Sequence, residues 1–280
     1  MRKIAILVDL ELDVFAGGHV KFWEKICYSI KNSFKDFHLT VFFLGGKLEK
    51  REIGKNVTFY TLKPILSSRI LKPLGVDADT TDLFPINLRL FTMLKNFDLI
   101  HSTDQLFTMA KTALYASKFW KIPLTTSLHT DTPSYTRYYV QKICEKLPRI
   151  LSYIVLSKLR LHQKIPHKQK VRMNDYLKHC QKAMINDHLD SSDFNLTSDT
   201  KEKISKLSRG VDRKVFKKKK INRTNLLKKY GISKKDKIIL FCGRVHELKG
   251  VFILSKVQKI LQNEMNLVSL LVGQNIHGDK

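Results

Sequence analysis

Short, continuous apolar runs alternate with longer amphipathic segments along most of the chain. Continuous runs are typical of strands that are buried on both faces, and apolar residues at every third or fourth position are typical of helices that cover a sheet. Strands are expected at residues 4–8, 39–44, 57–62, 98–101, 122–127 and 183–185, and helices at 20–30, 87–94 and 106–120. This alternation predicts a doubly wound α/β domain, which binds ligands at the carboxyl ends of its strands.

The same alternation returns after a polar stretch that is rich in lysine. The expected elements there are helices at residues 225–230 and 251–261 and strands at 237–242 and 267–272. We therefore expect one complete Rossmann-like domain over residues 1–216, a basic linker with a first helix over 217–236, and the start of a second Rossmann-like domain over 237–280.

Positive charge is in large excess, because 51 lysine and arginine residues stand against 25 aspartate and glutamate residues and give a net charge of +26. Such a balance predicts an anionic partner, which is a nucleic acid, an anionic membrane surface or a phosphorylated substrate. Lysines spread over solvated faces are the alternative. Nucleic acid is not expected, because no aromatic residues interleave with the lysine run 217–220 for base stacking.

Residues 140–181 combine a helical pattern with many basic side chains. An amphipathic basic face of this kind can lie on anionic lipid. It can also be an ordinary solvated helix face, and the pattern favours that interpretation.

The cysteines and the N-terminal residues indicate the cellular compartment of the protein. The four cysteines form no C-x-x-C pair, which indicates free thiols in a reducing compartment. The first nine residues hold too few apolar side chains for a signal-peptide core, and no apolar run is long enough to span a membrane. We expect a cytoplasmic protein, with peripheral docking on the inner face of a membrane as an open alternative.

Gly17 and Gly18 separate the first expected strand from the first helix. A strand, a glycine turn and a helix N-terminus together favour phosphate binding. The G-x-G-x-x-G fingerprint is absent, so a dinucleotide site is not supported. A tight turn without a ligand remains an alternative.

The segment Phe241–Gly250, with the sequence FCGRVHELKG, repeats this arrangement in the second half of the chain. Arg244 and Lys249 add positive charge beside the small residues of the turn. This pattern predicts a phosphate site, and a solvated loop remains the alternative.

His129 and Asp131 directly follow an expected buried strand. At that position His129 can donate hydrogen bonds to a substrate, and Asp131 can orient His129 or bind a hydroxyl group. A histidine that only caps the loop is the alternative. Metal binding is less favoured, because two groups make half a site at best.

Four stretches in this order resemble the retaining glycosyltransferases of family 4 (glycosyl transferase group 1). They are Gly17-Gly18, the segment 128–133 with Tyr135, the segment 209–212 with Phe216, and Gly243-Arg244 with Lys249-Gly250. The resemblance implies the GT-B fold, with two Rossmann-like domains that face a cleft. It is strongest to members that glycosylate lipid acceptors, which suggests a role in cell-envelope or lipid glycosylation.

The resemblance also implies roles for single residues. Arg244 and Lys249 would bind the diphosphate of a nucleotide-sugar donor, and the loop of Gly17 and Gly18 would cover the phosphates or the sugar. His129 would contact the sugar near its reacting carbon. The remaining two, Asp131 and Tyr135, would support a lipid or glycan acceptor. The family transfers the sugar with retention of configuration and needs neither a bound metal nor a cofactor.

One departure from the family pattern lies at the end of the chain. The family's second domain continues for on the order of another hundred residues and includes two glutamates that hold the donor. No residue follows Lys280, so we expect a C-terminally truncated, fragmentary or split enzyme whose own activity is in question. The alternative function is a non-catalytic protein that binds a membrane or a partner.

Overall fold

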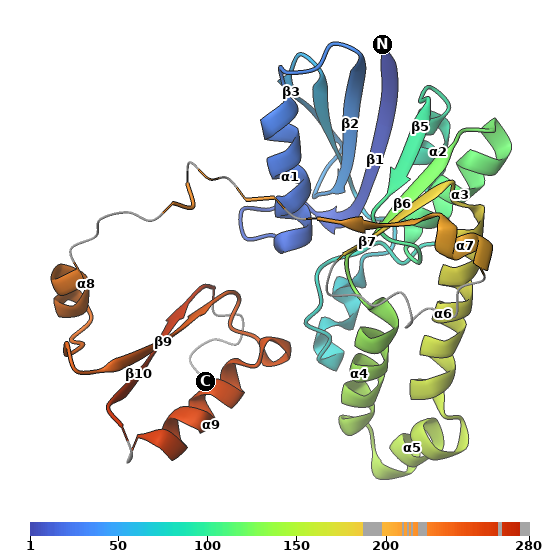
Figure 1. Ribbon diagram of the computed structural model, residues 1–280. Helices are drawn as coiled ribbons and strands as arrows, with labels where there is room; N and C mark the ends of the chain where they lie inside the picture. The colour runs from blue at the N-terminus through green and yellow to red at the C-terminus, as the bar shows by residue number, and fades with distance from the viewer. Residues whose placement is uncertain are drawn as a thin grey trace. The chain divides into compact units, whose positions relative to one another are not determined.

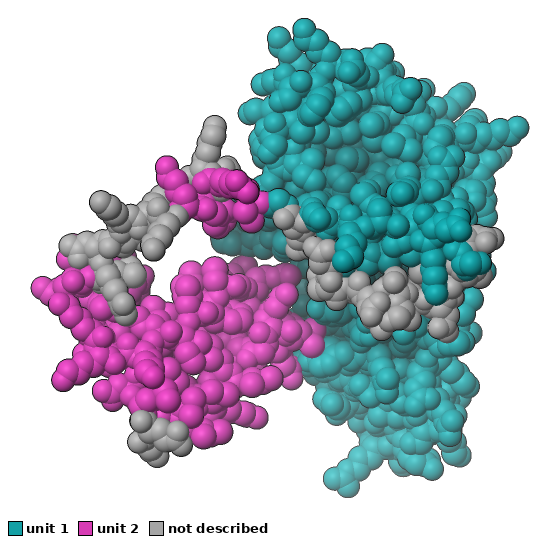
Figure 2. Space-filling view, viewed as in Figure 1, with its two compact units in different colours: residues 1–210 teal, residues 211–280 magenta. Residues whose placement is uncertain are grey.

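The computed structural model describes residues 1–186, 198–208, 210–211, 213, 215–217, 223–262 and 265–274. The chain divides into two compact units, Met1–Gly210 and Val211–Lys280, which are coloured separately in Figure 2. Two residues of the segment 209–212, Arg209 and Asp212, lie outside the described residues.

The described part of the first unit is built on an eight-stranded sheet with the strand order β3-β4-β2-β1-β5-β6-β7-β8 (Figure 1). Its strands are β1 (Arg2–Glu11), β2 (Phe37–Leu44), β3 (Glu49–Gly54), β4 (Val57–Leu62), β5 (Leu99–Ser102), β6 (Leu124–Leu128), β7 (Lys182–Asn186) and β8 (Ile204–Leu207). Its helices are α1 (Gly18–Ile30), η1 (Ser68–Leu74), α2 (Leu88–Leu94), α3 (Thr108–Trp120), α4 (Thr132–Glu145), α5 (Arg149–Tyr153), η2 (Ile154–Lys158), α6 (Leu161–His179) and α7 (Ser198–Glu202).

Both faces of the sheet are covered. Ile6 and Val8 of β1 pack with buried side chains of α1, whereas Ala5 and Leu7 of the same strand pack with α2 and α3. Alternate residues of a strand point to opposite faces, so a strand covered on both faces needs apolar residues at every position. The expected Rossmann-like α/β class of the first unit is confirmed.

One strand of the described sheet runs antiparallel to the others. The edge strand β3 pairs antiparallel with β4, and no strand was predicted there. Its sequence, EKREIG, is charged and largely exposed, so it carries no buried apolar run that would mark it as a strand. Charged residues on an edge strand discourage pairing with another chain.

The segment 63–82 follows β4 and contains one short helix. Residues Ser68–Leu74 form the 3-10 helix η1. The Asp82 carboxylate accepts hydrogen bonds from the backbone N–H groups of Ile65 and Leu66 at 2.8 and 2.9 Å. The Ser68 hydroxyl accepts from the N–H of Thr81 at 2.9 Å. These contacts fix both ends of the segment.

The described part of the second unit contains α8 (Arg223–Lys229), β9 (Lys237–Cys242), η4 (Glu247–Lys249), α9 (Val251–Leu261) and β10 (Leu267–Val272). The two strands pair in parallel, with Lys237 opposite Leu267. The bounds of β9, α9 and β10 are the predicted ones. Among all described residues, no helix has both the length and the apolar character needed to cross a bilayer.

The strand order of the first unit locates its ligand-binding edge. From β1 the chain moves outward to β2 and β4, and it then returns to the other side of β1 with β5, β6 and β7. Ligands of doubly wound sheets bind outside the carboxyl ends of the strands where the order reverses, which here is between β1 and β5.

Candidate functional site

His129 lies at this edge, directly after β6. The residue is 5% exposed, and its Nε2 atom is 2.8 Å from the hydroxyl oxygen of Ser127. The same hydroxyl oxygen lies 3.0 Å from Nε2 of His101 on β5, whose Nδ1 is 2.9 Å from the Thr125 hydroxyl. Ser127 therefore bridges the two histidine rings.

A backbone carbonyl sets the direction of this hydrogen-bond chain. The Thr125 hydroxyl donates to the carbonyl oxygen of Ile100 at 3.4 Å, and a carbonyl can only accept. With that proton used, His101 donates from Nδ1 to Thr125 and accepts at Nε2 from Ser127. The Ser127 hydroxyl then accepts from Nε2 of His129, because it has a single proton.

The buried His101 keeps this chain neutral. Burial lowers the pKa of His101 from 6.5 to about 4, so the ring is uncharged near neutral pH. A neutral His101 can donate with one nitrogen and accept with the other, as the chain of hydroxyl groups requires. His101 therefore orients Ser127 and, through it, His129.

Aromatic rings from α1 complete the surroundings of His129. The His19 ring stacks on the His129 ring, with centroids 4.0 Å apart and an angle of 17° between the planes. Phe22 lies 5.6 Å from His129, and Trp23 lies 5.2 Å from His101, between centroids. The N-terminal turn of α1 and the end of β6 thus form one site.

Sequence reasoning selected His129 and missed His19 and His101. His19 follows the two glycines directly, and His101 lies within an expected strand. The available signal was a common cluster with His129: His19 directly follows the glycine pair, and His101 lies next to the last residue of β5. Distance along the sequence hid it, because β1, β5 and β6 become neighbours only in the sheet.

The glycine turn begins α1 beside His19. Gly17 is the N-cap residue in extended conformation, and no side chain caps the helix there. A methyl group on Gly18 would meet no described atom within 4 Å. The folded chain therefore gives no steric reason for glycine at position 18, and it leaves space for a ligand to approach the backbone.

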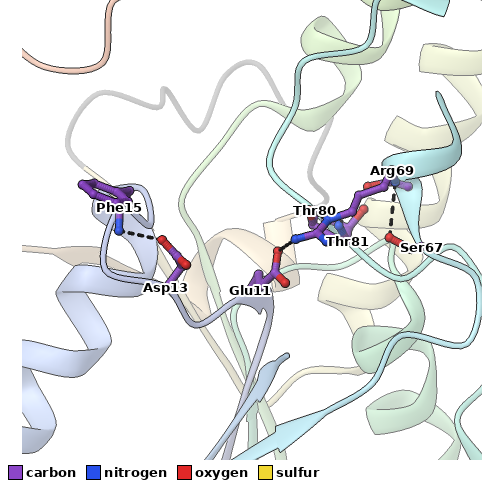
Figure 3. Close-up of polar contacts among 8 residues, drawn as sticks. Glu11, Asp13, Phe15, Ser67, Arg69, Thr80 and Thr81 are labelled. Atoms are coloured by element: carbon purple, nitrogen blue, oxygen red, sulfur yellow. Dashed lines mark hydrogen bonds and ion pairs between the residues drawn. The ribbon is translucent and has the colours of Figure 1, made fainter. Parts of the chain in front are cut away.

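Hydrogen bonds and an ion pair hold the loop that leads to these glycines (Figure 3). Glu11 at the end of β1 pairs with Arg69 of η1. The Asp13 carboxylate accepts from the backbone N–H of Phe15 at 2.8 Å, and Arg69 donates from its backbone N–H to the Ser67 hydroxyl at 3.3 Å. The segment 67–82 thus packs beside the end of β1.

Asp131 occupies the N-cap of α4. Its carboxylate accepts from the backbone N–H of Ser134 at 3.3 Å and also from the Ser134 hydroxyl. Tyr135, which is 39% exposed, lies one turn further along. Asp131 thus has a structural role at the start of α4, and the structure brings it into the loop that carries His129.

Two buried carboxyl groups underlie this edge and were not predicted. Asp9 accepts from the backbone N–H groups of Asp82 and Met109 at 2.9 and 2.7 Å. Asp104 accepts from those of Leu106 and Phe107, both at 2.8 Å. Burial raises the pKa of both carboxyl groups, and the negative charge of Asp104 raises that of Asp9 further. No group of three metal-binding side chains is found among the described residues.

In the second unit, the turn after β9 carries Arg244 and Lys249. The backbone N–H groups of Gly243 and Val245 donate to the carbonyls of Val272 and Gln274, both at 2.9 Å. His246 is buried and accepts at Nδ1 from the N–H of Leu248 at 3.1 Å. Arg244 is half-buried and Lys249 is exposed, so the turn is firmly held and presents positive charge.

Two glycines shape this turn. Gly250 has φ +74°, in the left-handed region, where it ends η4 and begins α9. A methyl group on Gly273 would lie 1.8 Å from the carbonyl oxygen of Gly243. Glycine at 273 is therefore required for the close approach of the two chain segments.

An apolar pocket of about 320 Å³ opens on the first unit. Its lining residues are Leu48, Leu62, Lys63, Ile65, Phe84, Ile86, Asn87, Leu88 and Arg89. Lys63 and Arg89 are exposed and form no ion pair with any other described residue. The pocket thus combines apolar walls with two positive charges.

Comparison with known proteins gives structural neighbours only. No protein-family model and no curated protein matches the sequence. The chain is similar to the crystal structure of Anabaena Alr3699/HepE in complex with UDP and glucose, with a TM-score of 0.58 and 15% identity. It is also similar to that protein in complex with UDP-glucose, with a TM-score of 0.56 and 14% identity. The matches cover 100% of this chain and 63% and 62% of the neighbour chains. The chain thus spans less than two thirds of HepE, and its Rossmann-like fold is that of a protein solved with a sugar nucleotide.

Proposed function

We propose that the protein is a glycosyltransferase that moves a sugar from a nucleotide-sugar donor to an acceptor. One observation carries the proposal: the His129 ring, held by Ser127 and His19, lies beside the glycine turn of α1 at the reversal point of the sheet. The likeness of the fold to HepE solved with UDP-glucose supports the donor class.

Within the second unit, Arg244 and Lys249 bind the donor diphosphate. The turn is held by the ladder to residues 272–274 and is followed directly by the N-terminus of α9, whose N–H groups favour an anion. Two fixed positive charges stabilise the negative charge that grows on the diphosphate as it leaves. Basic side chains can therefore take the part that a metal ion plays in other transferases.

Within the first unit, His129 contacts the transferred sugar close to its reacting carbon. The hydrogen bond to Ser127 and the stacking of His19 hold the ring in one orientation, which supports this contact. The glycine turn of Gly17 and Gly18 lies against the donor, and the open space at Gly18 supports this. Asp131 and Tyr135, at the start of α4, support the acceptor side.

The acceptor is a lipid with an anionic head group. The pocket at Leu62 and Phe84 supports a lipid over a saccharide, because its walls are apolar and Lys63 and Arg89 are placed to pair with a phosphate. A short-chain lipid phosphate should therefore compete with a fluorescent fatty acid for the pocket, and Phe84→Asp should abolish binding of both. If the acceptor is instead a saccharide, the short-chain lipid phosphate should not displace the fluorescent fatty acid.

Resemblance to family 4 further suggests transfer with retention of configuration. Proton NMR of the product gives the anomeric configuration directly. The same configuration as in the donor supports retention, and the opposite configuration overturns it without affecting the assignment as a transferase.

Calorimetry with UDP, ADP and GDP tests the donor site without requiring turnover. We expect the 280-residue chain to bind one of them, and Arg244→Ala or Lys249→Ala to weaken that binding by about tenfold or more. The control is Lys256→Ala, which removes an exposed lysine from α9. The proposal fails if no diphosphate binds, or if the control weakens binding as much as Arg244→Ala does.

A further inference from the structure

A helical arm extends from the first unit. The long helices α4 and α6 pack against each other, and the chain joins them through α5 and the π-helix η2. Figure 1 shows α5 at the far end of this pair, away from the sheet. We call residues 147–160, which form this end, the arm tip.

The arm tip is apolar in sequence but is not buried. Its helices read RILSY and IVLSK, and no residue of either helix is buried in the described structure. Ile150 is 76% exposed, Tyr153 58%, Leu151 49% and Leu159 46%. Single exposed apolar residues are ordinary on a protein surface, but a contiguous group of large ones marks an interaction site.

The charge around the arm tip has one sign. No aspartate or glutamate occurs between Glu145 and Asp175. The basic residues in that interval are Lys146, Arg149, Lys158, Arg160, Lys164, Lys168, Lys170 and Arg172. Arg149, Lys158 and Arg160 are exposed and form no ion pair with any described residue. The surface is therefore complementary to a negatively charged partner.

We propose that the arm tip inserts its apolar side chains into the interface of an anionic lipid bilayer. Ile150, Leu151 and Tyr153 enter the boundary between head groups and acyl chains, where a tyrosine has both an apolar ring contact and a polar partner. Arg149 and Lys158 on the same short segment remain at the level of the lipid phosphates.

Insertion at the arm tip differs from attraction by the basic face of α6. The lysines at 164, 168 and 170 lie on exposed positions of α6, along the side of the arm. They attract the protein to the surface over a range of about 10 Å at 0.1 M salt. The apolar side chains of the arm tip, by contrast, can enter the bilayer, so they determine how deeply this end of the arm inserts.

Anionic lipid is favoured over a protein partner by the chemistry of the tip. A protein interface has a core depleted in charge, with aromatic residues enriched. Here Arg149 and Lys158 flank a run of mainly apolar residues, and basic residues beside an apolar surface are the composition of interfacial anchors. The inference does not depend on sugar transfer, and vesicle binding is measured without a donor.

Co-sedimentation with vesicles tests the proposal. Binding to vesicles with equal parts of phosphatidylcholine and phosphatidylglycerol should exceed binding to pure phosphatidylcholine, and Ile150→Ser with Leu151→Ser should reduce it by about tenfold or more. The matched control is Ile253→Ser with Ile260→Ser, which removes two exposed isoleucines from α9. Equal binding by the tip variant and the control variant overturns insertion.

A fluorescent label reports depth directly. Cys242 is the exposed cysteine, and Cys27, Cys144 and Cys180 are buried. In a Cys242→Ser background, an NBD dye on Ile150→Cys should shift to shorter wavelength and brighten on anionic vesicles, whereas the dye on Ile253→Cys should not. If the protein sediments with the vesicles but the emission of the dye at position 150 does not change, the protein is held only by surface attraction. That outcome overturns the proposal.

Discussion

At Gly18, the effect of a substitution on stability can be distinguished from its effect on ligand binding. It is the first residue of α1, its φ is not in the left-handed region, and a methyl group there would meet no described atom within 4 Å. Alanine favours helices over glycine, so Gly18→Ala should raise the free energy of unfolding by about 0.5 kcal/mol. The same methyl group should weaken nucleoside diphosphate binding by about tenfold or more, because it holds the ligand away from the backbone.

Gly46 provides the matched control. A methyl group there also meets no described atom within 4 Å, but the residue lies in the loop between β2 and β3. Gly46→Ala should leave diphosphate binding unchanged in calorimetry. Unchanged binding in Gly18→Ala would show that the glycine turn does not contact the donor.

His101 gives the first unit a specific sensitivity to acid. Burial lowers its pKa from 6.5 to about 4. Between these values the unfolded chain binds a proton that the folded protein does not, so the free energy of unfolding falls as the pH falls. The slope reaches about 1.4 kcal/mol per pH unit, and the total is about 3 kcal/mol. Denaturant unfolding from pH 4 to 8 should show this contribution as a difference between wild type and His101→Gln.

The comparison with His101→Gln is needed because the buried carboxyl groups change the free energy of unfolding with pH in the opposite direction. Burial raises the pKa of Asp9 and Asp104, so the stability that they contribute is lost as the pH rises above their unfolded values. Their contribution is common to both proteins and cancels. The two curves should differ by a constant from pH 7 to 8 and converge toward pH 4. Parallel curves over the whole range would contradict the assignment.

At the scale of single elements, the sequence predicted most strands and helices of the first unit. A strand covered on both faces is mainly apolar, so β2 stands out through the apolar run at its carboxyl end, and β4 through its β-branched and aromatic residues. The edge strand β3 was missed because its residues are exposed and charged. The 3-10 helix η1 was missed because the segment around it is anchored by hydrogen bonds that the side chains of Asp82 and Ser68 accept, and these bonds form only in the folded chain.

The candidate site also contains residues that the sequence indicates and contacts that it does not. Gly17, Gly18 and His129 carry local signals, since each directly adjoins a strand end or a helix start. The stacking of His19 and the bridge from His101 through Ser127 join residues from α1, β5 and β6. Such contacts depend on strand order, and the spacing of residues in the sequence does not encode strand order.

The N-cap of α4 allows the structural and chemical roles of Asp131 to be separated. Asp131→Ala removes the hydrogen bond to the Ser134 N–H and should lower the free energy of unfolding by about 1 kcal/mol. Asp131→Asn keeps an accepting oxygen at the cap and should cost less than about 0.5 kcal/mol. If the carboxylate supports the acceptor, the Asn variant should still lose turnover by about tenfold or more. Normal turnover in a stable Asp131→Asn variant would show that Asp131 only caps α4 and does not support the acceptor.

At the scale of the whole chain, the two units bury very different amounts of apolar surface. The first unit has two large clusters of buried apolar residues, one on each face of the sheet. Among the described residues of the second unit, only Leu227, Ile232 and Val251 are buried apolar residues. Apolar burial is the main favourable contribution to folding, so the second unit should open at a lower free energy than the first.

Hydrogen exchange measured by mass spectrometry tests this difference and the donor site together. Amides of β9 and β10 should exchange about a hundredfold faster than those of β1 and β2, because a difference of roughly 3 kcal/mol in opening free energy corresponds to that ratio. A bound nucleoside diphosphate stabilises only the state that binds it. Its addition should therefore slow exchange at residues 243–250 and leave β2 unchanged. Slow exchange of β9 without ligand would contradict the assigned difference in stability, whereas equal exchange with and without ligand would contradict the diphosphate site.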